Sequence, residues 1–398
     1  MGETTPMPIP LYENTEDAEN GERTEDYAYD LPLERIAQEP VEPRDAGRLL
    51  VFDRETGDVT HDRFRRIGAY LRPGDLLVLN DSRVRPARVW ATKPNGGRLE
   101  LLVLRPTADG NGSDDGHDGN AGNAGDAGDW EMLVKPGRRA PVGTTFALTD
   151  REGRTAEPPV YGEVRAKAGD GVVTVRIFGP LDPALAALGE MPLPPYIARR
   201  LPREAAERYQ TAYARTLGSA AAPTAGLHFT PGLLDDLRAA GIGTATVTLH
   251  VGLDTFRPVT ERDPAAHPMH AEWFAAPPET AAAIVATRRA GGRVVAVGTT
   301  SVRVLESVAA RDERGNGIGG GWEAAQAAGA EGWTRLFIRP GYRFRATDAL
   351  VTNFHLPRST LLMLVSAFAG RERVLAAYTE AVREGYRFFS FGDACLFL

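Results

Sequence analysis

Residues 74–179 alternate hydrophobic and polar side chains in short runs that Gly and Pro interrupt. This period of two is typical of half-buried strands, and no helical period replaces it. The pattern predicts a small antiparallel β-barrel or sandwich. We place six strands there, at residues 75–80, 87–93, 98–105, 130–136, 144–149 and 172–178.

After about residue 190 the pattern changes to helices and strands in alternation. Thr230 and Pro231 form an N-cap and a first helical position, and residues 244–251 form a near-continuous run of strand-favouring residues suited to a buried strand. Such alternation predicts an α/β layer fold with a mostly parallel sheet and flanking helices. Further helices are expected at 278–292, 302–310, 359–369 and 372–385, and further strands at 293–298 and 388–397.

The two patterns predict a discontinuous α/β domain with a β-barrel inserted into it. We assign residues 27–73 and 180–398 to the α/β domain and residues 74–179 to the barrel domain. Three polar segments are too poor in hydrophobic residues to fold. They are the acidic tail 1–26, the Gly/Asn/Asp-rich loop 107–129 inside the barrel, and the loop 311–321.

Composition narrows the protein class. The 398 residues, 42% of them hydrophobic, are enough for two or three domains. The longest apolar run is residues 360–369, well short of a membrane span, and the N-terminus lacks the apolar region of a signal peptide. Cys395 is the single cysteine, which excludes a disulfide framework and a cysteine-cluster zinc site. We therefore expect a cytoplasmic protein.

The net charge of −7 is unevenly distributed. Residues 1–30 carry a net charge of −8, and residues 107–129 contain six aspartates and no Lys or Arg. Without these two segments the remainder has a net charge of +7. The folded part is therefore compatible with a polyanionic partner, although the charge does not demand one.

Polar clusters stand where strands are expected to end, which is where ligands bind in parallel sheets. His228 precedes a helix, His250 ends a buried strand, and residues 298–303 form a strand-to-helix turn. The remaining candidates are His267, His270 and Glu272; Asn353 and His355; and Asn80, Asp81, Arg83 and Arg85.

Each cluster also has a structural interpretation. A histidine beside a strand is more often a satisfied interior residue than a catalyst, and a capped strand-to-helix turn is common. Five of the seven histidines fall between residues 228 and 355, but no HxxxH spacing and no cysteine ligands accompany them. We therefore expect no metal.

Nine strings in this order are far more specific than any single cluster. The chain resembles the S-adenosylmethionine:tRNA ribosyltransferase-isomerase family of queuosine biosynthesis over about residues 27–395. The strings are GDLLVLNDSRVRPAR, MPLPPYI, RYQTAYA, APTAGLHF, LHVGLDTF, HPMHAEWF, VAVGTTSVRVLES, ALVTNFHLPRSTLLMLVSAFAG and YRFFSFGDA.

The resemblance implies an activity. The family transfers and isomerises the ribosyl group of S-adenosylmethionine onto 7-aminomethyl-7-deazaguanine at the tRNA wobble position. The products are epoxyqueuosine in tRNA, adenine and methionine, and neither a metal nor a redox cofactor is needed. The family fold, an α/β domain with an inserted β-barrel, agrees with the division predicted from the pattern. We expect a monomer without membrane contact.

The chemistry suggests roles for the clusters. A sulfonium acidifies the hydrogens on the adjacent ribose carbon, so a base is needed, and His250 or His228 is the candidate. His270 with Glu272 would assist adenine departure. Asn353 and His355 would line the same crevice. Thr299, Thr300, Ser301 and Arg303 would hold the methionyl end, and Asn80, Asp81, Arg83 and Arg85 would contact the modified base or nearby phosphates.

One departure from the family pattern affects this site. Leu253 and Asp254 stand where the family has small residues. Two alternatives therefore stay open: a paralogue that uses the same chemistry on a small amine or free nucleobase, and a non-catalytic nucleic-acid-binding protein. An ordinary methyltransferase is disfavoured, because no GxGxG loop follows an early strand.

Overall fold

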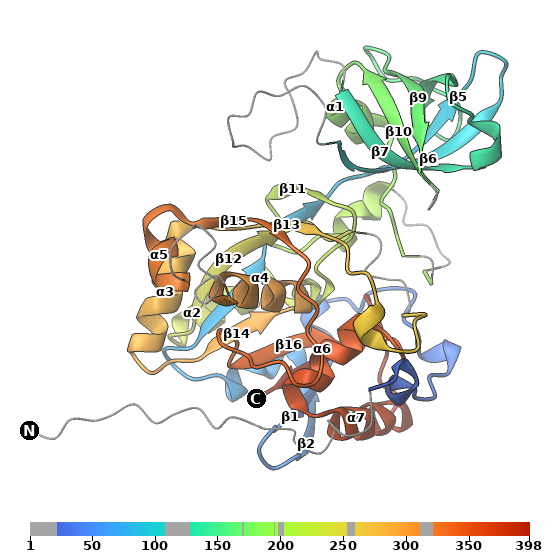
Figure 1. Cartoon of the computed structure of the whole chain (residues 1–398). Coiled ribbons are helices and arrows are strands. Elements are labelled where there is room, and N and C mark those ends of the chain that lie inside the picture. The colour runs from blue at the N-terminus through green and yellow to red at the C-terminus, as the bar shows by residue number, and fades with distance from the viewer. Residues whose placement is uncertain are drawn as a thin grey trace, which may run out of the picture. The chain divides into compact units, whose positions relative to one another are not determined.

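The computed structural model describes residues 22–107, 128–168, 171–194, 196–197, 203–252, 259–310 and 321–398. The chain folds into two compact units (Figure 1). The first unit comprises residues 1–80, 224–247 and 254–398, and the second comprises residues 81–223 and 248–253. The pattern of the sequence places the barrel domain at 74–179 instead, so the structure assigns more of the chain after the barrel to the second unit.

A nine-stranded sheet forms the first unit, in the order β15-β13-β12-β3-β14-β16-β17-β1-β2. Its four central strands β12, β3, β14 and β16 run parallel, while β17, β2 and β15 each form an antiparallel pair. This confirms the predicted α/β class. The strands are β1 (Arg48–Phe52), β2 (Val59–Arg63), β3 (Leu76–Asn80), β12 (Gly243–Leu249), β13 (Glu272–Ala276), β14 (Val294–Val297), β15 (Ala330–Thr334), β16 (Ala349–Asn353) and β17 (Ala394–Phe397).

The helices follow from local sequence signals. Thr230 Oγ1 accepts a hydrogen bond from Leu233 N at 3.1 Å, and Ser359 Oγ accepts one from Leu362 N at 3.2 Å, so both predicted starts are N-caps. Helices α3 and α4 pack on β3 and β14, α5 packs on α3, and α6 on α7 (Figure 1). The helices are α2 (Pro231–Ala239), α3 (Pro278–Arg289), α4 (Thr299–Ala309), α5 (Gly321–Ala328), α6 (Thr360–Ala369) and α7 (Arg371–Arg383).

Short 3-10 helices connect these elements. In the first unit they are η1 (Thr24–Tyr27), η2 (Leu33–Arg35), η3 (Arg44–Ala46), η4 (Phe64–Tyr70), η7 (Thr224–His228) and η9 (Pro264–Ala266).

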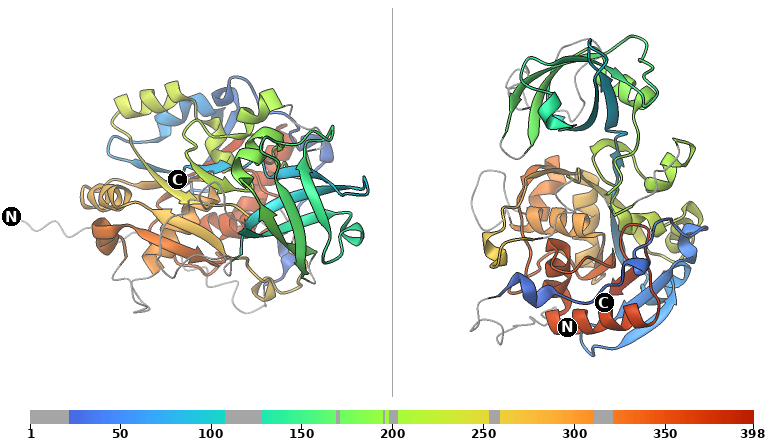
Figure 2. Two further views of the ribbon diagram at one scale, coloured as in Figure 1. Left: turned by 90° about the horizontal axis from the view of Figure 1, so that it is seen from above. Right: turned by 90° about the vertical axis from the view of Figure 1, so that its right-hand side faces the viewer.

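The second unit is built around a closed six-stranded barrel in the order β10-β7-β6-β5-β8-β9 (Figure 2). Alternate residues such as Val89, Leu101 and Met132 fill its interior, as the period of two predicts. A two-stranded sheet of β4 and β11 also belongs to this unit. The elements are β4 (Ser82–Val84), β5 (Arg88–Thr92), β6 (Arg98–Pro106), β7 (Gly128–Lys135), η5 (Gly137–Arg139), β8 (Thr145–Thr149), β9 (Tyr161–Lys167), β10 (Val172–Phe178), α1 (Leu181–Leu188), η6 (Arg203–Tyr209) and β11 (Thr216–Ser219).

One predicted barrel strand is wrong. Residues 75–80 form β3 of the large sheet, where all five strand residues are buried, because this run is apolar on both faces. The sixth barrel strand is β9, which the sequence analysis missed. Its inward position Gly162 has no side chain to mark the alternation, and a Cβ there would lie 2.5 Å from the Phe146 ring.

Two other predicted segments differ from the structure. Residues 22–26, the predicted end of the disordered tail, are ordered: Thr24 N donates to Arg262 O at 3.0 Å, and Arg339 pairs with Glu22 at 2.7 Å. The last strand is shorter than predicted and begins at Ala394. Of the other residues predicted to be disordered, Gly128 and Asp129 begin β7 and Gly321 begins α5, whereas residues 1–21, 108–127 and 311–320 lie outside the described residues.

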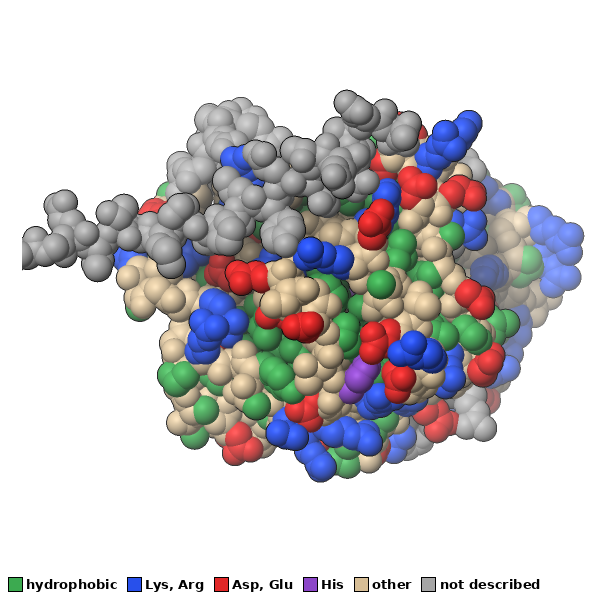
Figure 3. All heavy atoms as spheres, turned by 90° about the horizontal axis from the view of Figure 1, so that it is seen from below, with side chains coloured by type: hydrophobic (Ala, Val, Ile, Leu, Met, Phe, Trp, Pro, Cys, Tyr) green, Lys and Arg blue, Asp and Glu red, His purple; other side chains and the backbone are tan. Residues whose placement is uncertain are grey.

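The surface is charged and mixed. On the face shown in Figure 3, side chains of both signs are interspersed with hydrophobic ones. Within the described parts of the chain, no helix combines the length and the apolar character that a membrane span requires.

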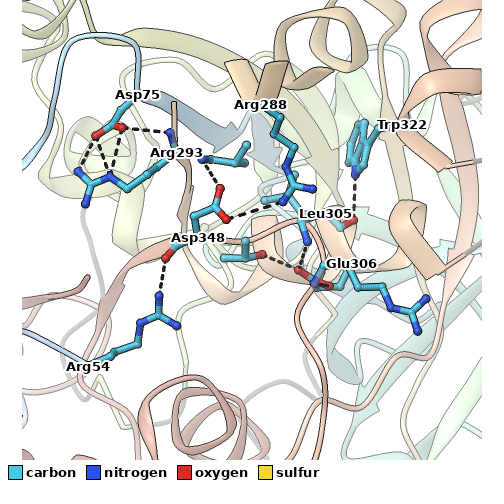
Figure 4. A network of polar contacts seen from close by, with 12 residues as sticks. Arg54, Asp75, Arg288, Arg293, Leu305, Glu306, Trp322 and Asp348 are labelled. Carbon is cyan, nitrogen blue, oxygen red and sulfur yellow. Dashed lines mark hydrogen bonds and ion pairs between the residues drawn. The ribbon is translucent and has the colours of Figure 1, made fainter. Parts of the chain in front are cut away.

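A polar network fixes the amino ends of the parallel strands (Figure 4). Arg293, just before β14, pairs with Asp75, just before β3, at 2.6 Å. Asp348, just before β16, accepts a hydrogen bond from Val294 N at 2.7 Å, and its carbonyl accepts one from Arg54 at 2.6 Å. Burial acts to raise the pKa of Asp75, but its hydrogen bonds with Arg293 and Arg72 bring the pKa below its usual range. Ion pairs and hydrogen bonds therefore hold the amino end of the sheet together. The opposite, carboxyl end is the one where a site can form.

Candidate active site

The carboxyl ends of the parallel strands lie together in the first unit. Asn80 is the last residue of β3, and its Nδ2 donates to Thr300 Oγ1 at 3.1 Å. Thr300 belongs to the first turn of α4, which follows β14 through Gly298 at φ 90°. Asn80 and Thr300 are both buried. The structure therefore brings two of the predicted binding positions into direct contact.

The first turn of α4 presents its backbone N–H groups at this edge. The first backbone N–H groups of any helix lack an acceptor within it, and here they are those of Thr299, Thr300 and Ser301. Ser301 Oγ donates to Val297 O at 2.8 Å, so this hydroxyl is used locally. Free N–H groups and the positive end of the helix dipole favour a carboxylate or phosphate.

A second polar group continues this edge at the end of β16. Thr224 Oγ1 donates to Asn353 Oδ1 at 2.8 Å, and Asn353 Nδ2 lies 3.3 Å from His228 Nε2. The His228 ring stacks on Phe64, with centroids 4.8 Å apart. Burial lowers the pKa of His228 to about 4, against the opposing effect of Asp393. His228 is thus a neutral, tightly held imidazole at neutral pH.

His355 lies apart from Asn353. Its Nε2 is 2.9 Å from Thr352 Oγ1, and burial lowers its pKa to about 3. Thr352 and Asn353 are successive residues of β16, so their side chains point to opposite faces of the sheet. The structure therefore places His355 with Thr352 and away from the crevice that Asn353 was expected to share with it.

Glu272 and Arg303 form a buried ion pair. The Arg303 guanidinium contacts the Glu272 carboxylate and also donates to Leu336 O at 3.1 Å and to Thr334 O at 3.3 Å. Arg303 was expected to hold the methionyl end and Glu272 to act with His270. The structure instead joins Glu272 to Arg303, while His270 is exposed. The pair connects β13 with α4.

The second unit holds the other candidate base. His250 Nδ1 lies 2.8 Å from Ser82 Oγ. Burial, and to a lesser degree Arg85, lowers the pKa of His250 to about 4. Gly218 in β11 approaches the ring so closely that a Cβ there would lie 2.5 Å from Nε2. The imidazole is therefore neutral at pH 7 and oriented by a hydroxyl and by the backbone.

The predicted residues Asp81, Arg83 and Arg85 are all engaged within the second unit. Asp81 accepts from Thr248 Oγ1 at 2.6 Å, and burial raises its pKa. Arg83 pairs with Glu207 at 2.5 Å. Arg85 is buried, pairs with Asp182 at 3.1 Å, and has its pKa lowered by burial. Both arginines therefore have an acidic partner.

Several site residues were missed by sequence reasoning. Ser82 and Thr248 hold His250 and Asp81, and Thr224 holds Asn353. Ser82 and Thr224 stand inside the strings NDSRV and APTAGLHF, so the signal was present but no role was attached to it. Leu253 and Asp254 lie outside the described residues. Among the residues described, no group of three or more His, Cys, Asp or Glu side chains is arranged to hold a metal ion.

Comparisons with known proteins show which proteins this chain is similar to. A family model described as "Queuosine biosynthesis protein" matches residues 24–397. The chain is 51% identical over 379 residues to S-adenosylmethionine:tRNA ribosyltransferase-isomerase of Symbiobacterium thermophilum, covering 94% of this chain and 100% of the relative. It is also 51% identical to the protein of the same name from Thermus thermophilus, with coverage of 95% and 100%. A crystal structure of S-adenosylmethionine tRNA ribosyltransferase from Thermotoga maritima, 36% identical, covers 94% of the chain and aligns with a TM-score of 0.49.

Proposed function

This chain belongs to the S-adenosylmethionine:tRNA ribosyltransferase-isomerase family of queuosine biosynthesis, and from this premise we propose how its residues perform the reaction. It is an enzyme that transfers the ribosyl group of S-adenosylmethionine to tRNA and isomerises it. We propose that the acceptor is 7-aminomethyl-7-deazaguanine at the wobble position, with epoxyqueuosine, adenine and methionine as products. We further propose that it works as a cytoplasmic monomer and without a metal or redox cofactor.

One observation carries the assignment of the methionyl site. Asn80 and the first turn of α4 meet at the carboxyl edge of the parallel strands, with the N–H groups of that turn available to an anion. In this proposal the methionine carboxylate binds there. Thr299 and Thr300 would orient it, whereas Arg303 acts on α4 through its ion pair with Glu272.

The proton-abstracting base in this proposal is His250. Both candidate histidines are neutral at pH 7, but the Nε2 atom of His228 faces Asn353 Nδ2, a donor that occupies its lone pair. The Ser82 hydroxyl lies 2.8 Å from His250 Nδ1 and orients the His250 imidazole, which is why we assign the base to His250. His250 would then take the proton from the ribose carbon next to the sulfonium, and the carbanion would remain stabilised by the sulfur. His228 would position Asn353.

Adenine release is the direct test of the function. We would follow it with S-adenosylmethionine alone, with tRNA carrying 7-aminomethyl-7-deazaguanine, and with small amines. Release that requires the modified tRNA is the expected result. Release without tRNA, or with a small amine in its place, would contradict the tRNA acceptor and favour a small-molecule acceptor. No release under any condition would contradict catalysis.

The variant Asn80→Asp tests the carboxylate site. A negative charge beside the first turn of α4 competes with the methionine carboxylate for the same N–H groups. We expect the KM for S-adenosylmethionine to rise about tenfold, which corresponds to ~1.4 kcal/mol of lost binding. The KM for tRNA is the internal control, and an equal rise in both values would contradict the assignment.

A further inference from the structure

One end of the barrel carries a cluster of cations contributed by three loops. The register of the strands brings these loops together: Arg98 pairs with Thr92, Glu100 with Lys135, and Val173 with Lys167. We call the cluster the basic rim. It comprises Lys93, Lys135, Arg138, Arg139 and Lys167.

The backbone of η5 holds the side chains of the basic rim in place. The short helix η5 ends at Ala140, which is fully buried in the barrel core and anchors the loop there. Lys93 Nζ donates to Arg139 O at 3.0 Å, and Lys167 Nζ donates to Gly137 O at 2.8 Å. Cations from two other loops are therefore tied to the backbone of η5, close to the side chains of Arg138 and Arg139.

Among the described residues, the side chains of the rim have no carboxylate partners. In the described part of the barrel, none of the five rim side chains forms an ion pair with Asp or Glu, and Asp170 in the third loop lies outside the described residues. Three arginines on the barrel wall differ from these, because each of them pairs with an acid. They pair at 2.7 Å (Arg105 with Glu131), 2.6 Å (Arg154 with Asp150) and 3.1 Å (Arg165 with Glu163). Like charges gathered without acids repel one another, and an external polyanion relieves that repulsion.

The sequence between β6 and β7 is acidic. At the end opposite the rim, β6 and β7 lead into residues 108–127, whose sequence has five aspartates and no Lys or Arg. The face of the molecule in Figure 3, in contrast, intersperses both signs. Among the described residues, the rim thus groups five cations that form no ion pair with an acid, within an acidic chain.

We propose that the basic rim binds the sugar-phosphate backbone of tRNA. This inference rests on the proposed function, which makes tRNA the acceptor, and it adds a binding surface on the barrel. Four of the five rim side chains are exposed and Lys93 is half-buried, so their charges reach solvent. Contacts of this kind position the nucleic acid without reading its sequence and make binding salt-dependent.

The test compares three double variants of the full chain. The variant Arg138→Gln/Arg139→Gln removes two rim charges, and Arg138→Lys/Arg139→Lys keeps them. The matched control, Arg65→Gln/Arg289→Gln, removes the charges of two exposed arginines of the first unit. The dissociation constant for tRNA is measured across a KCl series. The KM for S-adenosylmethionine is measured in the adenine-release assay.

We expect the rim Gln variant to bind tRNA about tenfold or more weakly near ~0.1 M salt, with the slope of log Kd against log salt reduced by about two. The Lys variant should keep the slope, the control should match the wild type, and the KM for S-adenosylmethionine should not change. A rim Gln variant that behaves like the control overturns the proposal. A rim Gln variant that retains tRNA binding and loses binding to anionic vesicles also overturns it, because the rim would then bind a lipid surface. Failure of the wild type to release adenine with tRNA would overturn the proposed function instead, since the binding series does not depend on turnover.

Discussion

Ser82 Oγ and His250 Nδ1 lie 2.8 Å apart although 168 residues separate them in the sequence. The hydroxyl fixes which ring nitrogen faces away from it and holds the ring plane. The interaction joins β4 to the residue that follows β12. A base that is oriented in this way is ready to take a proton without first losing rotational freedom.

The first prediction concerns the base. We expect His250→Ala to lower kcat by about 10²- to 10⁴-fold, which is the usual contribution of a general base, and Ser82→Ala to lower it about tenfold. Because burial lowers the pKa of His250 to about 4, kcat should be flat above about pH 6 and fall as the pH approaches 4. Single-turnover adenine release across this range measures both effects. A loss of less than about tenfold for His250→Ala would exclude it as the base.

The second prediction uses the close approach of Gly218 to the His250 ring. Gly218→Ala places a Cβ where Nε2 already lies, so the ring must move. We expect kcat to fall at least about tenfold, because a small displacement of a catalytic group is costly. Gly232→Ala is the control, since nothing lies within 4 Å of the added Cβ there. Equal kcat values for the two variants would show that the ring position does not matter.

A third prediction separates structure from chemistry at the Glu272–Arg303 pair. Glu272→Ala leaves a buried guanidinium without its acid, and we expect the free energy of unfolding to fall by about 3–5 kcal/mol. The double variant Glu272→Leu/Arg303→Met removes both charges and should recover most of this loss. Urea unfolding measures both values.

The exposed pair of Asp235 with Arg238 gives the matched control for that experiment. Asp235→Ala should lower the free energy of unfolding by less than about 1 kcal/mol. If Glu272→Ala lowered the free energy of unfolding by no more than Asp235→Ala does, solvent would reach the buried pair and Arg303 would be free to take another partner.

The fourth prediction is a pH dependence of stability. The pKa of His355 is about 3 in the folded protein and about 6.5 when unfolded. Between these values the unfolded chain binds the proton and the folded protein does not. The free energy of unfolding is therefore highest above pH 6.5 and falls toward pH 3, by up to about 1.4 kcal/mol per pH unit from this group.

Removing this histidine should flatten the dependence. Urea midpoints for His355→Gln should change less between pH 6.5 and 4 than those of the wild type. If His355→Gln kept the full slope, the histidine would not contribute through its proton.

The sequence predicted those parts of the fold that depend on local pattern. Thr230 and Ser359 begin helices because their hydroxyls accept hydrogen bonds from the first turn, and β14 is a buried strand because it is continuously apolar. The contact of Asn80 with Thr300 was not predicted, because residues 75–80 were assigned to the barrel and not to the large sheet. β9 was missed because Gly162 removes the inward side chain on which the alternation depends.

Pairings between distant segments could not be predicted. Glu272 is two positions after His270 in the sequence, yet its partner is Arg303 on α4. Only the packing of β13 against α4 decides this. Likewise, Asn353 and His355 are two residues apart but β16 ends between them, so the chain turns and the histidine bonds Thr352. Spacing shows which residues are close in sequence, whereas tertiary packing decides which atoms meet.

The hairpin of β6 and β7 is already closed before the chain enters residues 108–127. Pro106 pairs with Trp130, and Thr107 N donates to Asp129 O at 2.9 Å. Since doubling the length of a loop closed in this way costs only about 0.6 kcal/mol, the segment beyond Thr107 is free to lengthen or shorten in evolution at little cost to the barrel. Its aspartates can therefore drift or be selected independently of the fold, which makes this position a natural site for engineered insertions.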